Sequence, residues 1–427
     1  MTIYSPALQA GWTGSLETLA QSSTRIRGEE SEAIMWADAQ YINTLNDIEL
    51  NVLMTQQVND EQESEIYQLF VSKKFSNANR VSMGRFQKSD MSGFYIIDGI
   101  LFNSKADTLN FNLYAGKPQR VEGFTVKKGK GIAGADLFIP PQKNTFSGKQ
   151  TFTANHQHKL SIQHQQDDYS SAQTATHTHH LDRVGLTSHI SIKPQAFPVS
   201  DFSPKHIEID AAINFHLQAE IIEKFYFNTA LTLNEKLMLN ISIKHDSYPD
   251  PAIDFKSQFY KLFNQGEQSE FQSNLYFSPR HAMQHSVEFR YIQREVGSEG
   301  RGLAFDSDFD WSQLNLKSRL EIFDFMNQKH AGIYLNVEHA LSSFSKLSLG
   351  SVIRIQQSQL RHDTVIYGAE MRWDWKIERD LLFYCSAEFI NQDRFKDISE
   401  LYNLRAPNDD YRLSVSLTKY WDTPWTL

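Results

Sequence analysis

Residues 206–221 read HIEIDAAINFHLQAEI, and every second position from Ile207 to Ile221 is apolar. The apolar positions are Ile207, Ile209, Ala211, Ile213, Phe215, Leu217, Ala219 and Ile221, and polar residues such as Glu208, Asp210, Asn214, His216 and Glu220 lie between them. Because successive side chains of a β-strand point to opposite faces, a period of two gives one apolar and one polar face. The stretch therefore predicts an extended strand between two different environments.

The same alternation recurs along the chain. It is seen in residues 109–115, 237–243, 331–337, 365–375 and 411–417. Helical periodicity of 3.6 residues is not sustained over a dozen residues in any part of the sequence. The pattern therefore predicts an all-β protein.

Composition excludes several classes of protein. The formal net charge of -9 leaves no basic stripe to replace phosphate counterions, which argues against a nucleic-acid partner. The single cysteine, Cys385, excludes a disulfide framework, an iron–sulfur cluster and the attachment of c-type haem to this chain. Aromatic residues make up 12% of the sequence, which argues against disorder.

The apolar runs are short. The longest are about five residues, such as 33–37 and 381–385, whereas a membrane-spanning helix needs ~18 or more. The first residues have neither a basic region nor an apolar core, so this numbering contains no recognisable signal peptide. Two interpretations stay open: a cytosolic protein, or a chain numbered without its leader.

The connections between the predicted strands alternate in length. Short ones include residues 44–47, 233–236, 278–281, 342–345 and 376–379, and longer polar ones include 116–130, 165–181, 244–267, 357–362 and 393–408. Short turns at one end and long loops at the other are typical of bacterial outer-membrane barrels, with the turns periplasmic and the loops extracellular. We therefore expect residues 1–427 to form one closed antiparallel transmembrane β-barrel of about 20 to 22 strands, without a separate plug domain.

Charged residues occupy alternate positions of the C-terminal strands. On a barrel these side chains face a water-filled lumen, and we expect the lumen-lining residues to include Glu288, Arg290, Asp306, Asp308, Asp310, Arg354, Glu370, Arg372, Asp374, Glu388 and Arg412. The three aspartates at 306, 308 and 310 form an acidic stripe, which is either a solvated wall or a cation-selecting element. They lack the glycine and closing glutamate of a calcium loop.

Aromatic residues lie near the ends of several predicted strands. They include Trp311, Trp373, Trp375, Tyr420, Trp421 and Trp425. This placement suits the aromatic girdles at the two surfaces of a membrane, although such residues also pack the core of a soluble all-β protein.

Three neighbouring segments carry a more particular pattern. They read Gly84-Arg-Phe-Gln87, Asp98-Gly99 and Leu113-Tyr-Ala-Gly-Lys-Pro118. This resembles a GRQ, DG and YAG-P pattern on three successive strands of porin-like outer-membrane barrels, some of which are encoded with multihaem cytochromes. The resemblance implies a cleaved signal peptide and a lumen that either conducts solutes or houses a cytochrome.

The residues of these segments also have a physical interpretation. Gly84, Gly99 and Gly116 predict a bulge, a bend or a close backbone contact. Arg85 and Asp98 lie on neighbouring predicted strands, where the right register would pair them. Such a pair is either a structural element of the wall or a selectivity element of the lumen.

Histidines are concentrated in one region. His156, His158, His164, His177, His179 and His180 fall within 25 residues, and we expect the last three in the loop 165–181. Clustered imidazoles bind Zn²⁺ or Cu²⁺ or respond to pH, but no metal-binding motif accompanies them. A hydrophilic strand-loop-strand excursion is the favoured explanation, so we predict no metal site. His177, His179 and His180 are the alternative candidates for metal ligands.

The sequence contains no catalytic motif, so we expect neither an enzyme nor a resident cofactor. The predicted function is an outer-membrane porin-like channel for polar or ionic solutes, with membrane lipid as its surroundings. One alternative is a barrel that sheathes a multihaem cytochrome and so takes part in electron transfer across the membrane. A second alternative is a soluble β-rich binding protein.

Overall fold

The computed structural model describes the chain except residues 1–8, 26–27, 44–46, 59–63, 76–78, 91–92, 106–108, 123–124, 129, 147–151, 171–175, 195–203, 219, 248–267, 295–298, 326–327, 359–360, 393–408 and 427. Within the described residues every regular element is a β-strand. These residues include no helix long and apolar enough to cross a membrane.

The strands follow one another with short gaps. Their bounds are β1 Gln9–Arg25, β2 Gly28–Asn43, β3 Ile48–Val58, β4 Ser64–Lys74, β5 Asn79–Asp90, β6 Gly93–Lys105, β7 Asn110–Glu122, β8 Thr125–Lys128, β9 Gly131–Phe146, β10 Phe152–Ser170, β11 Thr176–Pro194, β12 His206–His216, β13 Ile221–Asn234, β14 Leu237–Asp246, β15 Gln268–Arg280, β16 Met283–Arg294, β17 Glu299–Trp311, β18 Leu314–Phe325, β19 Gln328–Ser342, β20 Ser345–Ser358, β21 Arg361–Glu378, β22 Leu381–Gln392 and β23 Asp409–Thr426.

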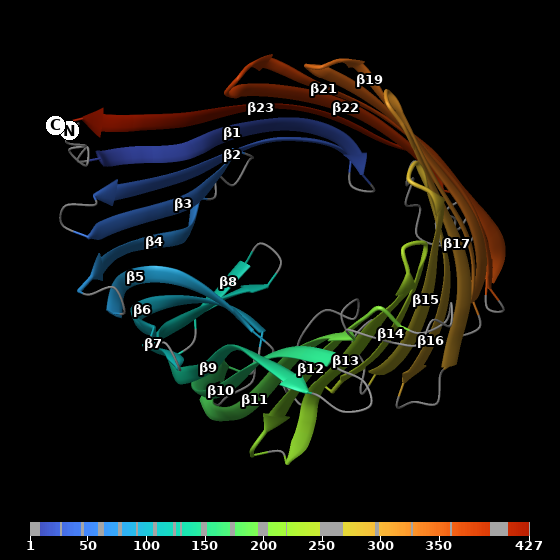
Figure 1. Ribbon diagram of the computed structural model, residues 1–427. Coiled ribbons are helices and arrows are strands. Elements are labelled where there is room, and N and C mark those ends of the chain that lie inside the picture. The colour runs from blue at the N-terminus through green and yellow to red at the C-terminus, as the bar shows by residue number, and fades with distance from the viewer. Residues whose placement is uncertain are drawn as a thin grey trace, which may run out of the picture.

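All of these strands belong to one antiparallel sheet that closes on itself. Nearly every strand pairs with its neighbours in sequence, and β1 pairs with β23 from Gln9↔Thr426 to Ser23↔Arg412. The short strand β8 pairs only with β7, which also pairs with β9. The sheet therefore has 23 described strands, of which 22 form the closed wall (Figure 1). The predicted fold class and strand number are confirmed.

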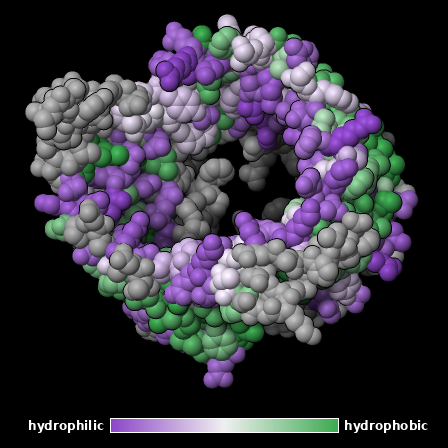
Figure 2. All heavy atoms as spheres, viewed as in Figure 1, coloured by the Kyte–Doolittle hydropathy of each residue, from purple (hydrophilic) through white to green (hydrophobic). Residues whose placement is uncertain are grey.

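The two faces of the wall differ in polarity. On β17 and β18, Leu303 and Ile322 are register partners with 58% and 67% of their surface exposed. The next outward pair is Phe305 with Leu320. Figure 2 shows hydrophobic residues on the outer rim and hydrophilic residues around the central opening. Large apolar side chains this exposed are stable in hydrocarbon rather than in water, so the soluble alternative does not suit this surface.

One end of the barrel has tight turns. Two residues connect β13 to β14, β15 to β16, β17 to β18, β19 to β20 and β21 to β22. At this turn end Trp311, Trp375 and Tyr420 are exposed on the strands, and Trp373 stacks on Trp375 at 5.6 Å between ring centroids. Trp311, Trp373 and Trp375 lie on the outer face where the sequence predicted a girdle, and the side chain of Trp425 is outside the described part of the structure.

At the opposite end, here called the loop end, several predictions were wrong. Residues 116–130 were expected to be a loop but lie mostly in β7 and β8, and the strand expected over residues 207–221 ends at His216 before β13 begins at Ile221. Residues 165–181 were expected to be a loop, but β10 continues to Ser170 and β11 begins at Thr176. Residues 357–362 likewise belong mostly to β20 and β21. Polar residues are found both in loops and in β-hairpins that extend into water. Polarity alone therefore cannot distinguish a loop from such a hairpin.

We expect neighbouring residues of β20 to tolerate arginine very differently. Ile353 faces outward, so Ile353→Arg places a charge in hydrocarbon at a cost of about 2–4 kcal/mol. The adjacent Val352 faces the opposite way, and Val352→Arg should cost far less. The free energies of unfolding in urea, measured in lipid vesicles, test the difference. Equal destabilisation by the two variants would contradict the assigned faces.

Candidate functional site

The inner wall between β15 and β20 carries a continuous group of charged side chains, here called the charged strip. It consists of Glu270, Glu288, Arg290, Asp306, Arg319, Glu321, His330 and Arg354. These residues come from six successive strands, β15 to β20. These residues all lie on the inner face. Successive side chains of a strand point to opposite faces, and each of these residues is an odd number of positions away from the outward-facing apolar residues of its strand.

Arg319 is at the centre of the charged strip. Its guanidinium donates to both oxygens of Asp306 at 3.1 and 3.2 Å and to Glu321 at 3.1 Å. A third carboxylate, Glu288, lies 3.5 Å away. Arg319 and Asp306 are register partners on β18 and β17, which brings them together across the hairpin. One cation therefore compensates three carboxylates.

The strip continues from Arg319 in both directions. Toward β15, Arg290 lies 2.9 Å from Glu288 and 3.3 Å from Glu270. Toward β20, Glu321 accepts hydrogen bonds from the Tyr334 hydroxyl at 2.8 Å and from His330 at 3.2 Å. The other ring nitrogen of His330 lies 3.2 Å from the Arg354 guanidinium, so that nitrogen is the acceptor in a neutral imidazole.

A second charged group lies on β21, β22 and β23. Arg372 pairs with Asp374 at 2.7 Å and lies over the ring of Tyr384. Glu370 and Glu388 are direct register partners, and Arg412 lies 3.4 Å from Glu388. Like charges placed opposite each other repel, so Arg412 reduces the repulsion within this group.

A hollow of about 620 Å³ joins the two groups. It is lined by Asp306, Asp308, Lys317, Arg319, Glu370, Glu388, Tyr276 and Tyr334, and Gly350 and Gly368 leave room in its floor. A space of this size accommodates a small polar molecule.

The acidic stripe is less acidic than the sequence suggested. Asp306 and Asp308 are register partners of Arg319 and Lys317, and only Asp310 faces a neutral partner, Asn315. Sequence analysis did not single out Lys317, Arg319 or Glu321. Their signal was present, because polar residues alternate with Leu316, Leu320 and Ile322 in this strand.

The histidine candidates lie on a strand rather than in a loop. The backbones of His177, His179 and His180 pair with Tyr169, Asp167 and Gln166, and their side chains are outside the described part of the structure. Among the side chains that are described, no group of three or more histidines, cysteines or carboxylates is arranged to hold a metal ion.

Arg85 and Asp98 form the ion pair that the sequence analysis had left dependent on the register. They are register partners on β5 and β6, and the guanidinium binds both carboxylate oxygens at 2.5 and 2.7 Å. They lie on the same side of these strands as the exposed Met83 and Ile100. The bidentate contact between neighbouring strands favours the structural interpretation.

A buried ion pair supports the wall at β11 to β13. The Arg183 guanidinium, whose residue is 6% exposed, binds both oxygens of Glu223 at 2.6 and 2.8 Å. Asn214 donates to the same carboxylate at 2.7 Å, and Arg183 also contacts Gln165 and Tyr95. The charges are thus paired and hydrogen-bonded, as burial requires.

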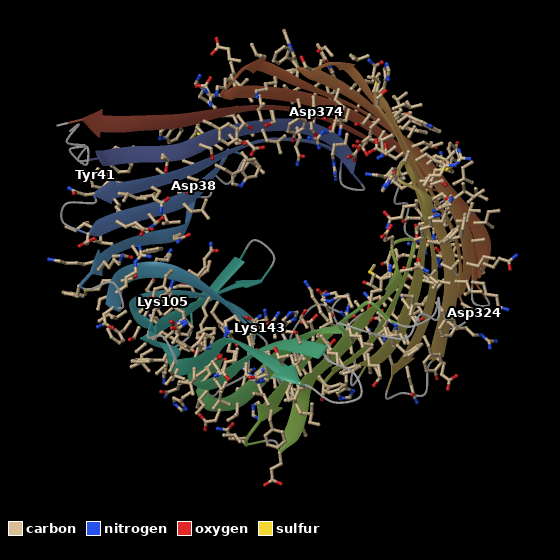
Figure 3. All side chains as sticks on the ribbon, viewed as in Figure 1. Asp38, Tyr41, Lys105, Lys143, Asp324 and Asp374 are labelled. Carbon is tan, nitrogen blue, oxygen red and sulfur yellow. The ribbon has the colours of Figure 1, made fainter. Side chains whose placement is uncertain are left out.

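Figure 3 illustrates the two faces with single residues. Asp38 lies on the inner side of β2, and Asp324 lies on the outer rim at the loop end of β18. Asp324 pairs there with Lys329 at 3.5 Å. Charged residues are therefore not confined to the lumen.

Comparison with solved structures identifies the fold. The siderophore receptor PirA from Pseudomonas aeruginosa aligns with a TM-score of 0.59 and 10% identity, over 96% of this chain and 80% of that chain. PirA from Acinetobacter baumannii aligns with a TM-score of 0.56 and 7% identity over the same shares, 96% and 80%. The chain has the fold of the bacterial outer-membrane β-barrels. No protein-family model and no curated protein matches the sequence.

Removing one partner of the buried pair should destabilise the barrel. Glu223→Gln keeps the shape of the side chain but removes the negative charge that binds the buried Arg183 guanidinium, which costs about 3–5 kcal/mol. As a control, Lys346→Met breaks the half-exposed pair with Glu338 and should cost below about 1 kcal/mol. Urea unfolding in vesicles measures both. A small effect of Glu223→Gln would contradict the importance of the pair.

Proposed function

We propose that the barrel is an outer-membrane channel through whose lumen polar or ionic solutes pass. The observation that supports this most directly is the polarity of the wall, apolar outside and charged inside. A continuous inner surface of paired charges remains hydrated, and a hydrated lumen admits small polar solutes.

The charged strip is the proposed solute-contacting surface. Its acids and bases alternate across β15 to β20, so a solute with either sign of charge meets a partner. The lumen-lining residues expected from the sequence, including Glu370, Arg372, Asp374, Glu388 and Arg412, belong to the same proposed surface. The single-domain organisation without a plug is part of the proposal, because a wide barrel conducts only when its lumen is not filled.

Purified protein in planar lipid bilayers should produce discrete, stable conductance steps in simple salt solution. A bilayer that stays insulating despite confirmed insertion would contradict the channel. If electron transfer then appeared only with a co-purified haem protein, the cytochrome sheath would be the better interpretation.

Ion selectivity should respond to the central arginine of the charged strip. Arg319→Gln leaves Asp306, Glu288 and Glu321 without their shared cation, so the permeability ratio of K⁺ to Cl⁻ should rise on the order of twofold. Lys329→Gln removes the same charge from the outer surface and serves as the matched control. Reversal potentials in a salt gradient measure both. An equal shift in the two variants would show that the strip lies outside the conduction path.

A further inference from the structure

Part of the sheet leaves the wall and enters the lumen. The segment, here called the inner flap, consists of residues 85–90 of β5, 93–98 of β6, 117–122 of β7 and all of β8. Figure 1 shows β8 inside the ring formed by the other strands. The inner flap is therefore built from wall strands and not from a loop alone.

The backbone pairing marks where the flap departs. Pairing between β4 and β5 ends at Leu69↔Arg85, whereas β5 and β6 remain paired as far as Asp90↔Gly93. On the other side, pairing between β7 and β9 ends at Gly116↔Ile132, and β7 continues with β8 instead. Within the described residues the flap strands pair only with one another beyond this line.

Three glycines lie side by side along the line of departure. Gly84 is the register partner of Gly99, which is the partner of Gly116. A Cβ at Gly99 would come within 2.6 Å of the Gly116 Cα, and Gly84 has a φ of +125°, which other residues rarely adopt. The backbones of β5, β6 and β7 therefore approach closely here, which permits a sharp bend of the sheet.

Polar contacts hold the outer side of the bend. Arg85, which binds Asp98, also donates to the carbonyl of Ile66 at 2.8 Å on β4, beyond the last β4–β5 partner. Gln119 donates to Asp98 at 3.2 Å. The guanidinium thus satisfies a backbone acceptor beyond the end of the sheet pairing.

Apolar and charged contacts hold the inner side against the wall. Phe86, Tyr95 and Ile97 are buried in a cluster with Tyr114 and Ile132, and Ile97 is 0% exposed. Lys88 lies 3.6 Å from Asp136 of β9, and the Arg183 guanidinium of β11 donates to the Tyr95 hydroxyl at 3.2 Å. This burial distinguishes the flap from the rest of the described inner wall, which is mostly polar.

From this geometry we propose that the inner flap is the constriction that sets the size limit of the channel. The inference rests on the proposed channel function. A 22-stranded barrel encloses a wide lumen, and the docked flap narrows it on the side of β5 to β11, across from the charged strip (Figure 1). Solutes then pass between the flap and the charged strip.

The flap also differs in charge from the opposite wall. By sequence, the flap carries six basic residues against three acids, namely Arg85, Lys88, Lys117, Arg120, Lys127 and Lys128 against Asp90, Asp98 and Glu122. A basic constriction favours anions. Removing it should widen the channel and at the same time shift its selectivity toward cations.

A shortened flap tests the constriction. Gln119 and Lys128 are register partners, so an Asn-Gly pair replacing residues 120–127 would close a two-residue hairpin between them. The wall strands, the glycines and the Arg85–Asp98 pair remain unchanged. The charge-only double variant Lys127→Gln, Lys128→Gln removes two positive charges without shortening the flap, so it separates effects of charge from effects of size. Heat-modifiable mobility on gels checks that each variant is folded.

We expect the shortened flap to raise single-channel conductance on the order of twofold and to admit larger polyethylene glycols, because the open cross-section increases. The charge-only variant should alter selectivity with little change in size limit. Unchanged conductance and size limit in the shortened variant of a conducting protein would overturn the proposal. If the natural chain were silent and only the shortened variant conducted, the flap would be a complete seal and the open channel would be wrong. If neither conducted, both proposals would fail.

Discussion

The structure depends on one constraint, which is that backbone amides and carbonyls surrounded by hydrocarbon must find partners within the chain. A strand at the edge of an open sheet cannot meet this requirement, whereas a sheet closed between β1 and β23 leaves no edge. The alternation of apolar and polar residues follows from the same closure, because one face of every strand meets lipid and the other meets the lumen.

The inner flap shows how the chain departs from the closed wall while gaining new partners at the line of departure. Where β5 to β7 turn inward, β8 supplies a new partner for β7, and the Arg85 side chain supplies a donor for the Ile66 carbonyl. The departure occurs at three adjacent glycines, where no side chain prevents a close backbone approach. The charged strip balances its acids through the partly exposed Arg319, where exact compensation of charge is less demanding than around the buried Arg183.

Much of the fold could be predicted from local patterns. The period of two around Ile209, the two-residue turns and the aromatic strand ends such as Trp311 indicated a barrel and its approximate size. The extension of β10 and β11 through His177 could not be recognised, since polarity is the same in an extended hairpin and in a loop. Arg319 was missed because two of its three carboxylate partners, Glu288 and Asp306, lie on other strands and are brought to it only by the register of the sheet.

The sequence by itself determined that the chain forms strands with two unlike faces, because side-chain alternation is a property of each strand alone. It also located the glycines and placed Arg85 and Asp98 on neighbouring strands, but it left their pairing to the register. Only the tertiary structure decided that these glycines bend a part of the sheet into the lumen, and that one arginine joins three acids. Register and closure decide such relations, and both depend on contacts between strands that no single stretch of sequence contains.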